Sequence, residues 1–295
     1  MIATLLALAS ACSWGVSDFL GGLMSRRLPT TTVMVISQAF GLVGIGIAFV
    51  ITGSSLPASE PMGYAIAAGA VGAIGLAAFY HALATGMVSL VAPIAATGAI
   101  VPVAVGLWEG EAVGFYGMAG IAAAIAGVIL ASVAPTSPDD ATKVDPVARL
   151  TSIGLAVVAA VLFGAYFALF ARATTGGLFG AALFQRMTSV SAATVMWVIA
   201  RRGRALAPAS ILPTGLTTRT AAAGLAGAGI LDVAANVLYG GASMQDLLSI
   251  SSVLSSLYPV ITVLMARVFL GERLAGIQGA GVVLALAGTT LIAAR

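Results

Sequence analysis

Ten long apolar runs, separated by short polar breaks, constrain this chain more than any other feature of its sequence. A helix needs about 20 mostly apolar residues to cross the roughly 30 Å of hydrocarbon in a bilayer. The runs are longer than the strands of a membrane barrel and do not alternate between polar and apolar residues. The sequence therefore predicts an all-α integral membrane protein with ten transmembrane helices, near residues 2–23, 31–51, 62–84, 88–107, 112–133, 151–171, 178–200, 219–242, 247–269 and 274–294.

The composition supports lipid as the solvent of the outer surface. Of the 295 residues, 60% are hydrophobic and 8% are charged, whereas a soluble domain carries roughly 25% charged residues. The net charge of +3 comes from few groups, and no run of Lys or Arg indicates a nucleic-acid partner. Cys12 is the only cysteine, so no disulfide can form within the chain.

One phrase occurs twice in the sequence. Residues 110–131 read GEAVGFYGMAGIAAAIAGVILA, and residues 271–292 read GERLAGIQGAGVVLALAGTTLI. Aligned without a gap, the two stretches share four glycine or glutamate positions, Gly110/Gly271, Glu111/Glu272, Gly120/Gly281 and Gly127/Gly288. A polar stretch lies near the midpoint, so we divide the chain into a first five-helix repeat, a linker and a second five-helix repeat, at residues 1–133, 134–150 and 151–295.

An odd number of helices in each repeat has a geometric consequence. If the first copy enters the membrane from one side, the second must enter from the other, and the two copies are inverted about an axis in the membrane plane. Inverted repeats around a central cavity are typical of secondary transporters. The alternative is a duplicated packing unit that has no part in transport.

The combination of features resembles a known family. The ten helices, the two repeats, Trp14-Gly15 in the first helix (matched by Phe163-Gly164 in the sixth) and the Gly-Glu pair before the last helix of each repeat are similar to EamA-type members of the drug/metabolite transporter superfamily. The resemblance implies a basket of helices around a central cavity, with amino acids, other small metabolites or drugs as substrates. It also implies that the third helix lines the cavity, which favours a site role for Tyr80 or His81.

The eighth apolar run carries the best-defined polar stripe. Asp232, Asn236 and Tyr239 follow one another at positions i, i+4 and i+7, so they share one face of a helix. Ionisable groups inside a membrane helix usually face the protein interior and often serve function. We expect this face to bind substrate; the alternative is that it joins helices by hydrogen bonds.

Other polar and aromatic residues in the apolar runs extend the candidate site. Arg186 needs a carboxylate partner, which Asp18 or Asp232 could supply, and we expect its role to be structural. A proton carrier must change protonation in the working pH range, for which Asp232 is the first candidate, followed by His81 and Asp18. Aromatic rings with polar tips suit an amphipathic solute, and the predicted substrate-binding residues are Trp14, Tyr80, His81, Tyr166, Asp232, Asn236, Tyr239 and Tyr258.

Prolines and glutamates near the helix ends form a structural group. Pro93, Pro102 and Pro259 are expected to interrupt the fourth and ninth helices, because a proline within a helix frees a carbonyl and bends the chain. Glu111 and Glu272 precede the fifth and tenth helices, where a carboxylate suits the positive helix end.

These observations predict a secondary active transporter, an exporter of a small organic metabolite such as an amino acid, that works by exchange or proton coupling. A multidrug or cationic drug efflux carrier is the alternative within this class, and a channel or intramembrane enzyme is the alternative outside it. The sequence lacks GxxxxGK[ST], HExxH and GxSxG motifs, so we expect no enzyme activity, no metal and no cofactor.

The expected partners are the lipid bilayer and a small-molecule substrate, with no nucleic acid, and the chain is compatible with a monomer. The expected location is the cell membrane, as a multi-pass protein of a bacterial inner membrane. Lys and Arg in the loops favour both termini outside, whereas the resemblance implies both termini in the cytoplasm, and both orientations stay open.

Overall fold

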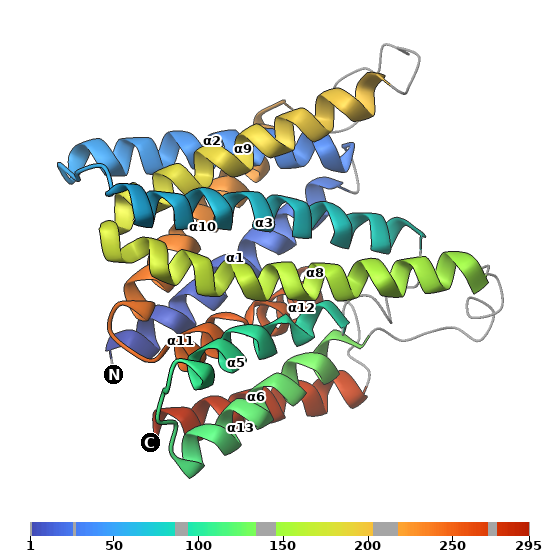
Figure 1. Ribbon diagram of the computed structural model, residues 1–295. Coiled ribbons are helices and arrows are strands. Elements are labelled where there is room, and N and C mark those ends of the chain that lie inside the picture. Colours follow the sequence, from blue (N-terminus) through green and yellow to red (C-terminus); the bar gives the residue numbers. More distant parts are fainter. Residues whose placement is uncertain are drawn as a thin grey trace.

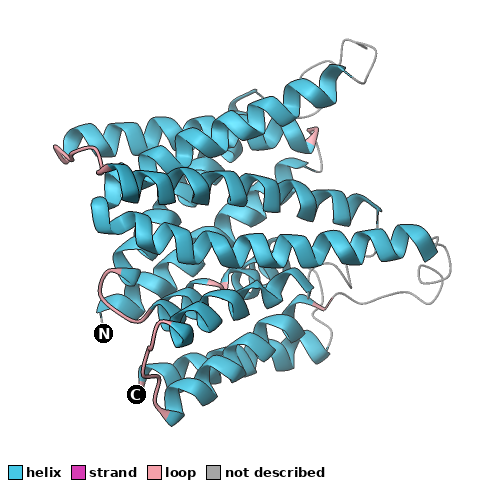
Figure 2. Cartoon of the chain, in the orientation of Figure 1, coloured by secondary structure: helices cyan, strands magenta, loops and turns pink. Residues whose placement is uncertain are grey.

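The computed structural model describes residues 2–25, 28–85, 94–133, 146–202, 218–270 and 276–294. Within these residues the chain is helical, with short turns and no strand (Figure 2). Helices are expected here because a helix satisfies the hydrogen bonds of its peptide groups internally, and lipid offers these groups no other hydrogen-bond partner. The all-helical part of the predicted fold is confirmed for the described residues.

Helical segments occupy every apolar run of the sequence. The first half contains α1 (Ile2–Ser25), α2 (Thr30–Ile51), α3 (Ser59–Thr85), the short η1 (Thr97–Ala99), α5 (Ile100–Trp108) and α6 (Phe115–Ser132). The second half contains α8 (Pro146–Ala173), the short η2 (Thr174–Gly176), α9 (Leu178–Arg202), α10 (Thr218–Ser243), α11 (Leu248–Ser255), α12 (Tyr258–Leu270) and α13 (Gly276–Ala293). Helix α8 begins inside the stretch that the sequence assigns to the linker.

Seven stretches among the described residues are long and apolar enough to cross a membrane. They lie in α1, α2, α3, α6, α8, α10 and across α11 and α12, whereas the apolar helices Ile94–Trp108 and Gly276–Ile292 are shorter. The protein is therefore a multi-pass membrane protein. Ten spanning helices remain a prediction.

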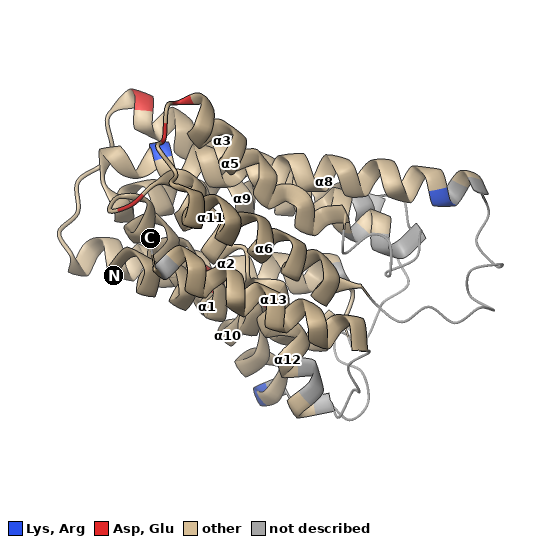
Figure 3. Cartoon of the chain, turned by 90° about the horizontal axis from the view of Figure 1, so that it is seen from below, with Lys and Arg blue, Asp and Glu red and all other residues tan. Residues whose placement is uncertain are grey.

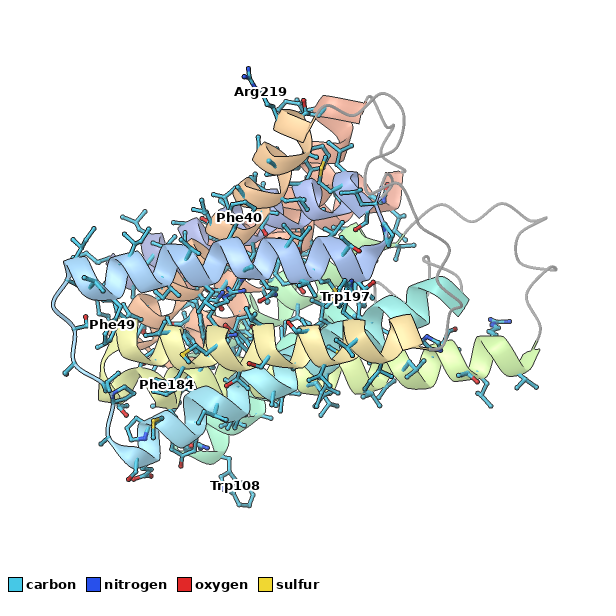
Figure 4. The ribbon with its side chains drawn as sticks, turned by 90° about the horizontal axis from the view of Figure 1, so that it is seen from above. Phe40, Phe49, Trp108, Phe184, Trp197 and Arg219 are labelled. Carbon is cyan, nitrogen blue, oxygen red and sulfur yellow. The ribbon has the colours of Figure 1, made fainter. Side chains whose placement is uncertain are left out.

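The helices run side by side, and the two termini lie at the same end of the bundle (Figure 1). We call this the terminal end. The ribbon is uncharged along most of its length, and the visible charged residues gather near helix ends (Figure 3). Trp108 points away from the bundle, as Figure 4 shows, and is 92% exposed. Exposed aromatic residues such as Trp108, Phe115 and Tyr116 suit the boundary between lipid and water.

The two halves pack in matching ways. Helix α1 lies along α10 as α8 lies along α3. Likewise α2 contacts α10 as α9 contacts α3, and both α2 with α9 and α6 with α13 form pairs between equivalent helices. Two glycine contacts fix the register: Gly15 in α1 packs on Tyr258 O and Ile261 of α12, and Gly164 in α8 packs on Gly98 O and Val101.

The glycines of the repeated phrase form the contact between α6 and α13. A Cβ atom at Gly120 would lie 2.8 Å from Gly288 O, and one at Gly288 would lie 2.7 Å from Gly120 O. One at Gly281 would lie 2.7 Å from Gly127 O. The early glycine of each copy thus meets the late glycine of the other, so the helices are antiparallel and reciprocal. Small residues allow this close approach, which provides the packing energy in lipid.

Candidate functional site

The site is centred on the face of α10 that packs into the bundle. Leu225, Ala228, Ala235 and Tyr239 on this face are all less than 5% exposed. Asp232 lies in the middle of the same stripe, yet its side chain is 27% exposed. This carboxylate is therefore the partly accessible point of a helix face that otherwise packs inside the bundle.

Two other helices supply the partners of the Asp232 carboxylate. Trp14 Nε1 in α1 donates a hydrogen bond to Asp232 Oδ1 over 2.9 Å. Arg186 Nη1 in α9 lies 2.6 Å from Asp232 Oδ2, and the Arg186 side chain is only 1% exposed. The carboxylate predicted for Arg186 is therefore Asp232, and this ion pair joins α9 to α10.

A polar residue of α2 completes the surroundings of the ion pair. Gln38 Oε1 accepts hydrogen bonds from Arg186 Nη1 and from Ser189 Oγ. Gln38 is absent from the predicted site, because an amide in an apolar run gives a weaker signal than a charged group. Its distance from Arg186 in the sequence also hides the contact.

Aromatic rings line the cluster next to Trp14. Its ring lies 6.4 Å from Tyr166, 6.2 Å from Tyr239 and 6.2 Å from Tyr258, measured between centroids. Phe167 lies 5.6 Å from Trp14 in an edge-to-face arrangement and was not predicted. The structure thus brings four predicted aromatic residues, Trp14, Tyr166, Tyr239 and Tyr258, together around the ion pair.

Asp18 extends the inner face of α1 toward the end opposite the termini. Ala7, Ala11, Trp14 and Asp18 follow one another at helical spacing on one face. The first three are buried, whereas Asp18 is exposed. Asp18 also lies one turn after Trp14, whose indole donates to Asp232.

Asn236 and Tyr239 share the inner face of α10, but protein groups occupy their polar atoms. Asn236 Nδ2 donates to the backbone oxygen of Asp232 over 2.6 Å. Tyr239 OH donates to Phe167 O over 2.8 Å and lies 3.0 Å from Ser252 Oγ. The Tyr239 contacts join α10 to α8 and α11, whereas the Asn236 contact stays within α10.

His81 lies apart from this cluster. It is exposed on α3, two helical turns after Ile74, which is 53% exposed. A spacing of seven residues places both side chains on one face of the helix, and this face is the outer one. The side chain of Tyr80 lies outside the described part of the structure.

Two of the predicted structural prolines follow an interruption of their helix. Pro102 follows the 3-10 turn η1 within the helical stretch Ile94–Trp108, and Pro259 follows the break between α11 and α12. Glu111 does not cap its own helix: its carboxylate accepts hydrogen bonds from the backbone N–H groups of Leu248 and Ser249 at the start of α11. Pro93 and Glu272 lie outside the described residues.

Glu109 and Arg172 form an ion pair at the terminal end, and Arg172 also lies over the ring of Tyr64, 5.8 Å from its centroid. Together with Glu111, this pair links the first half of the chain to the second. Among the described residues, no three His, Cys, Asp or Glu side chains lie close enough to hold a metal ion.

Comparison with known proteins agrees with this architecture. Residues 150–294 match the model of the EamA-like transporter family. The second half of the chain is an EamA domain. The resemblance to the drug/metabolite transporter superfamily is thereby confirmed. No curated protein matches the chain.

A solved structure extends the likeness of fold beyond the EamA domain. The structure, titled only "Crystal structure of protein", covers 98% of this chain and 95% of its own, with a TM-score of 0.75 and 16% sequence identity. At this identity the likeness shows the fold alone. It includes the first half, which lies outside the EamA match.

Proposed function

We propose that this EamA protein is a secondary carrier that binds one small organic metabolite at Asp232 and alternates its access between the two sides of the membrane. The observation that carries the proposal is the partly exposed Asp232 carboxylate on an otherwise buried helix face, paired with a buried arginine. Ionisable groups at this depth are costly, and they mark substrate or ion pathways in membrane proteins.

The matching contacts of the two halves support an arrangement of ten helices as inverted repeats. Helices α6 and α13 are antiparallel and contact each other through equivalent glycines. A two-fold axis that relates such a pair is perpendicular to both helices, so it lies in the membrane plane when they span the bilayer. This symmetry lets the same packing form a gate on either side of a central site.

The surroundings of Asp232 favour a small amphipathic substrate. Trp14, Tyr166 and Tyr258 offer apolar faces, and Arg186, Asp18 and Asp232 offer few charges. A polyanion would need a larger basic cluster than a single arginine. An amino acid or a similar compound fits this balance, and we propose outward transport across a bacterial inner membrane.

A carrier of organic cations is the second candidate. The observation that favours it is the pair of carboxylates, because Asp18 is exposed one turn after Trp14, and Asp232 already has an arginine partner. Either substrate is moved by exchange or by proton coupling. Asp232 and Asp18 are the proposed coupling groups, because both carboxylates are accessible on helix faces that are otherwise buried.

Counterflow in proteoliposomes tests the function. Vesicles loaded with an unlabelled compound are diluted into its labelled form, with a panel of amino acids and organic cations tested in turn. A carrier gives transient, saturable accumulation with at least one compound, and Asp232→Asn abolishes it. A channel gives flux that rises linearly with concentration and does not respond to substrate on the opposite side, and this result would reject the proposal.

A further inference from the structure

Two nitrogens of the Arg186 guanidinium have no partner in the part of the chain that the structure describes. The Arg186 Nη1 serves both Asp232 and Gln38, whereas Nε and Nη2 are buried and have no hydrogen-bond partner among the residues that the structure describes. A buried charged donor that lacks an acceptor is expensive for a protein. The two free nitrogens therefore indicate a group that binds there and is not part of the chain.

The geometry of the guanidinium specifies the shape of that group. The N–H bonds of Nε and Nη2 lie along one edge of the plane and point in the same direction. Two parallel donors of this kind match the two oxygens of a carboxylate. Because Asp232 is bound through Nη1, this edge is free to accept a second carboxylate without breaking the internal ion pair.

Tyr166 provides a further donor and an apolar wall. Its hydroxyl is buried and has no hydrogen-bond partner in the described part of the chain. Its ring packs edge-to-face on Trp14 and lies against Gly72, where a Cβ atom would come within 3.2 Å of it. The same Trp14 donates a hydrogen bond to Asp232, the ion-pair partner of Arg186, so the Tyr166 hydroxyl and the Nε–Nη2 edge of Arg186 belong to one cluster.

We infer that the Nε–Nη2 edge of Arg186, together with the Tyr166 hydroxyl, binds the carboxylate of an amphipathic organic acid whose apolar part lies on Trp14. This inference rests on the proposed function, since the acid is the transported compound. Gly41 of α2 covers the guanidinium in this conformation, because a Cβ atom there would lie 3.5 Å from Arg186 Cζ. Access therefore requires α2 to move relative to α9, as an alternating carrier must allow.

A pair of isosteric probes tests the site in the full-length protein. 3-Phenylpropionate and 3-phenylpropionamide share their shape, but only the first has a carboxylate. Binding is followed by the fluorescence of Trp14 after the other two tryptophans are changed by Trp108→Phe and Trp197→Phe. We expect the carboxylate to bind at least about tenfold more tightly than the amide, the effect of one charged hydrogen bond. Equal affinities, or no response to either probe at millimolar concentration, would overturn the inference.

Variants assign the preference to the proposed edge. Arg186→Lys keeps the charge for Asp232 but loses the parallel donors, so the preference for the carboxylate should disappear. Arg172→Lys makes the same replacement at the terminal end and should keep the preference. If Arg186→Lys does not fold, Tyr166→Phe removes one hydroxyl and should reduce carboxylate affinity about threefold to tenfold, and more than it reduces amide affinity, because a hydrogen bond to a charged acceptor is the stronger one. An unchanged preference in a folded Arg186→Lys or in Tyr166→Phe contradicts the inference.

The outcomes separate this inference from the proposed function. Carboxylate-selective binding without counterflow would leave the site in place and reject the carrier. Counterflow with no selectivity for the carboxylate would keep the carrier and reject the site.

Discussion

The contact between α1 and α10 and the contact between α8 and α3 have the same geometry but different chemistry. In the first contact, Trp14 binds Asp232, and Ser10 and Ser17 donate to Ala235 O and Ala228 O. In the second, Phe163 takes the place of Trp14, and it packs on Gly75 and Phe79. One contact is polar and the other is apolar.

The register of the two contacts identifies equivalent residues. Gly69 in α3 packs against Gln185 O of α9, and Gly229 in α10 packs against Ser37 O of α2. Counting along each helix from these glycines shows that Gly72 is the equivalent of Asp232 in the other repeat. Phe79 is likewise the equivalent of Tyr239. The Arg186–Asp232 ion pair therefore belongs to the second copy, and the equivalent position of Asp232 in the first copy is the uncharged Gly72.

Removing the charge from the polar contact should have the largest effect. Asp232→Asn leaves the buried Arg186 without its counter-ion, which typically costs about 3–5 kcal/mol. Thermal unfolding in detergent measures the loss. Glu60→Gln, which changes an exposed carboxylate in the first turn of α3, is the control and should differ from wild type by less than about 0.5 kcal/mol.

A double variant sharpens this comparison. In this variant, Asp232→Gly introduces the residue found at the equivalent position of the first half, Gly72. Arg186→Gln removes the positive charge that would otherwise lack a counter-ion. We expect it to be more stable than Asp232→Asn and to lack transport. If the double variant is the less stable of the two, the ion pair is not what makes the copies differ.

The glycines between α6 and α13 test whether the halves are equivalent in packing. A Cβ atom at Gly127 would overlap Ala285, and one at Gly288 would overlap Ala124, at matching positions of the repeat. Gly127→Ala and Gly288→Ala should each cost about 1–3 kcal/mol, the usual penalty of overpacking, and by similar amounts. Gly279→Ala, with nothing within 4 Å of the added atom, should not destabilise. Clearly unequal losses at Gly127 and Gly288 would argue against the symmetry.

Tyr239→Phe converts one residue of the polar contact to the type found at the equivalent position, Phe79. The lost hydroxyl bonds both Phe167 O and Ser252, so unfolding should become easier by about 1 kcal/mol. Tyr116→Phe is the control, because Tyr116 is 63% exposed. Equal effects of the two substitutions would show that the buried hydroxyl contributes nothing.

His81→Ala should have the smallest effect. Because His81 lies on the outer face of α3, transport driven by a pH gradient should continue at the wild-type rate, and stability should stay within about 0.5 kcal/mol. Flux measurements in liposomes check the rate. A loss of gradient-driven flux with substrate exchange intact would contradict this prediction and indicate that His81 takes part in proton coupling.

The apolar runs were sufficient to predict the helical segments, because these depend on local composition. The stripe that contains Asp232 was readable for the same reason. The glycine contact between α6 and α13 was not predicted, because it depends on how the two repeats pack. The break between α11 and α12 was readable from Pro259, because a proline cannot continue a helix without bending it. Gln38 was not readable, since its role depends on which helices become neighbours. The partner of Glu111 could not be predicted either: the start of α11 is distant in sequence and close only after folding.

The reactivity of two cysteines on α1 tests most directly whether the charged centre faces water inside the bundle. Cys12 is exposed away from the inner face of α1, so it serves as the lipid-facing control. Asp18→Cys, in a Cys12→Ser background, places a thiol at the exposed position one turn after Trp14. A membrane-impermeant thiol reagent is applied to vesicles from each side. We predict that Cys12 in the wild type stays unlabelled, whereas the variant is labelled from the side opposite the termini and is protected by bound substrate. Labelling of the variant no faster than that of Cys12 would contradict a water-accessible site in this protein.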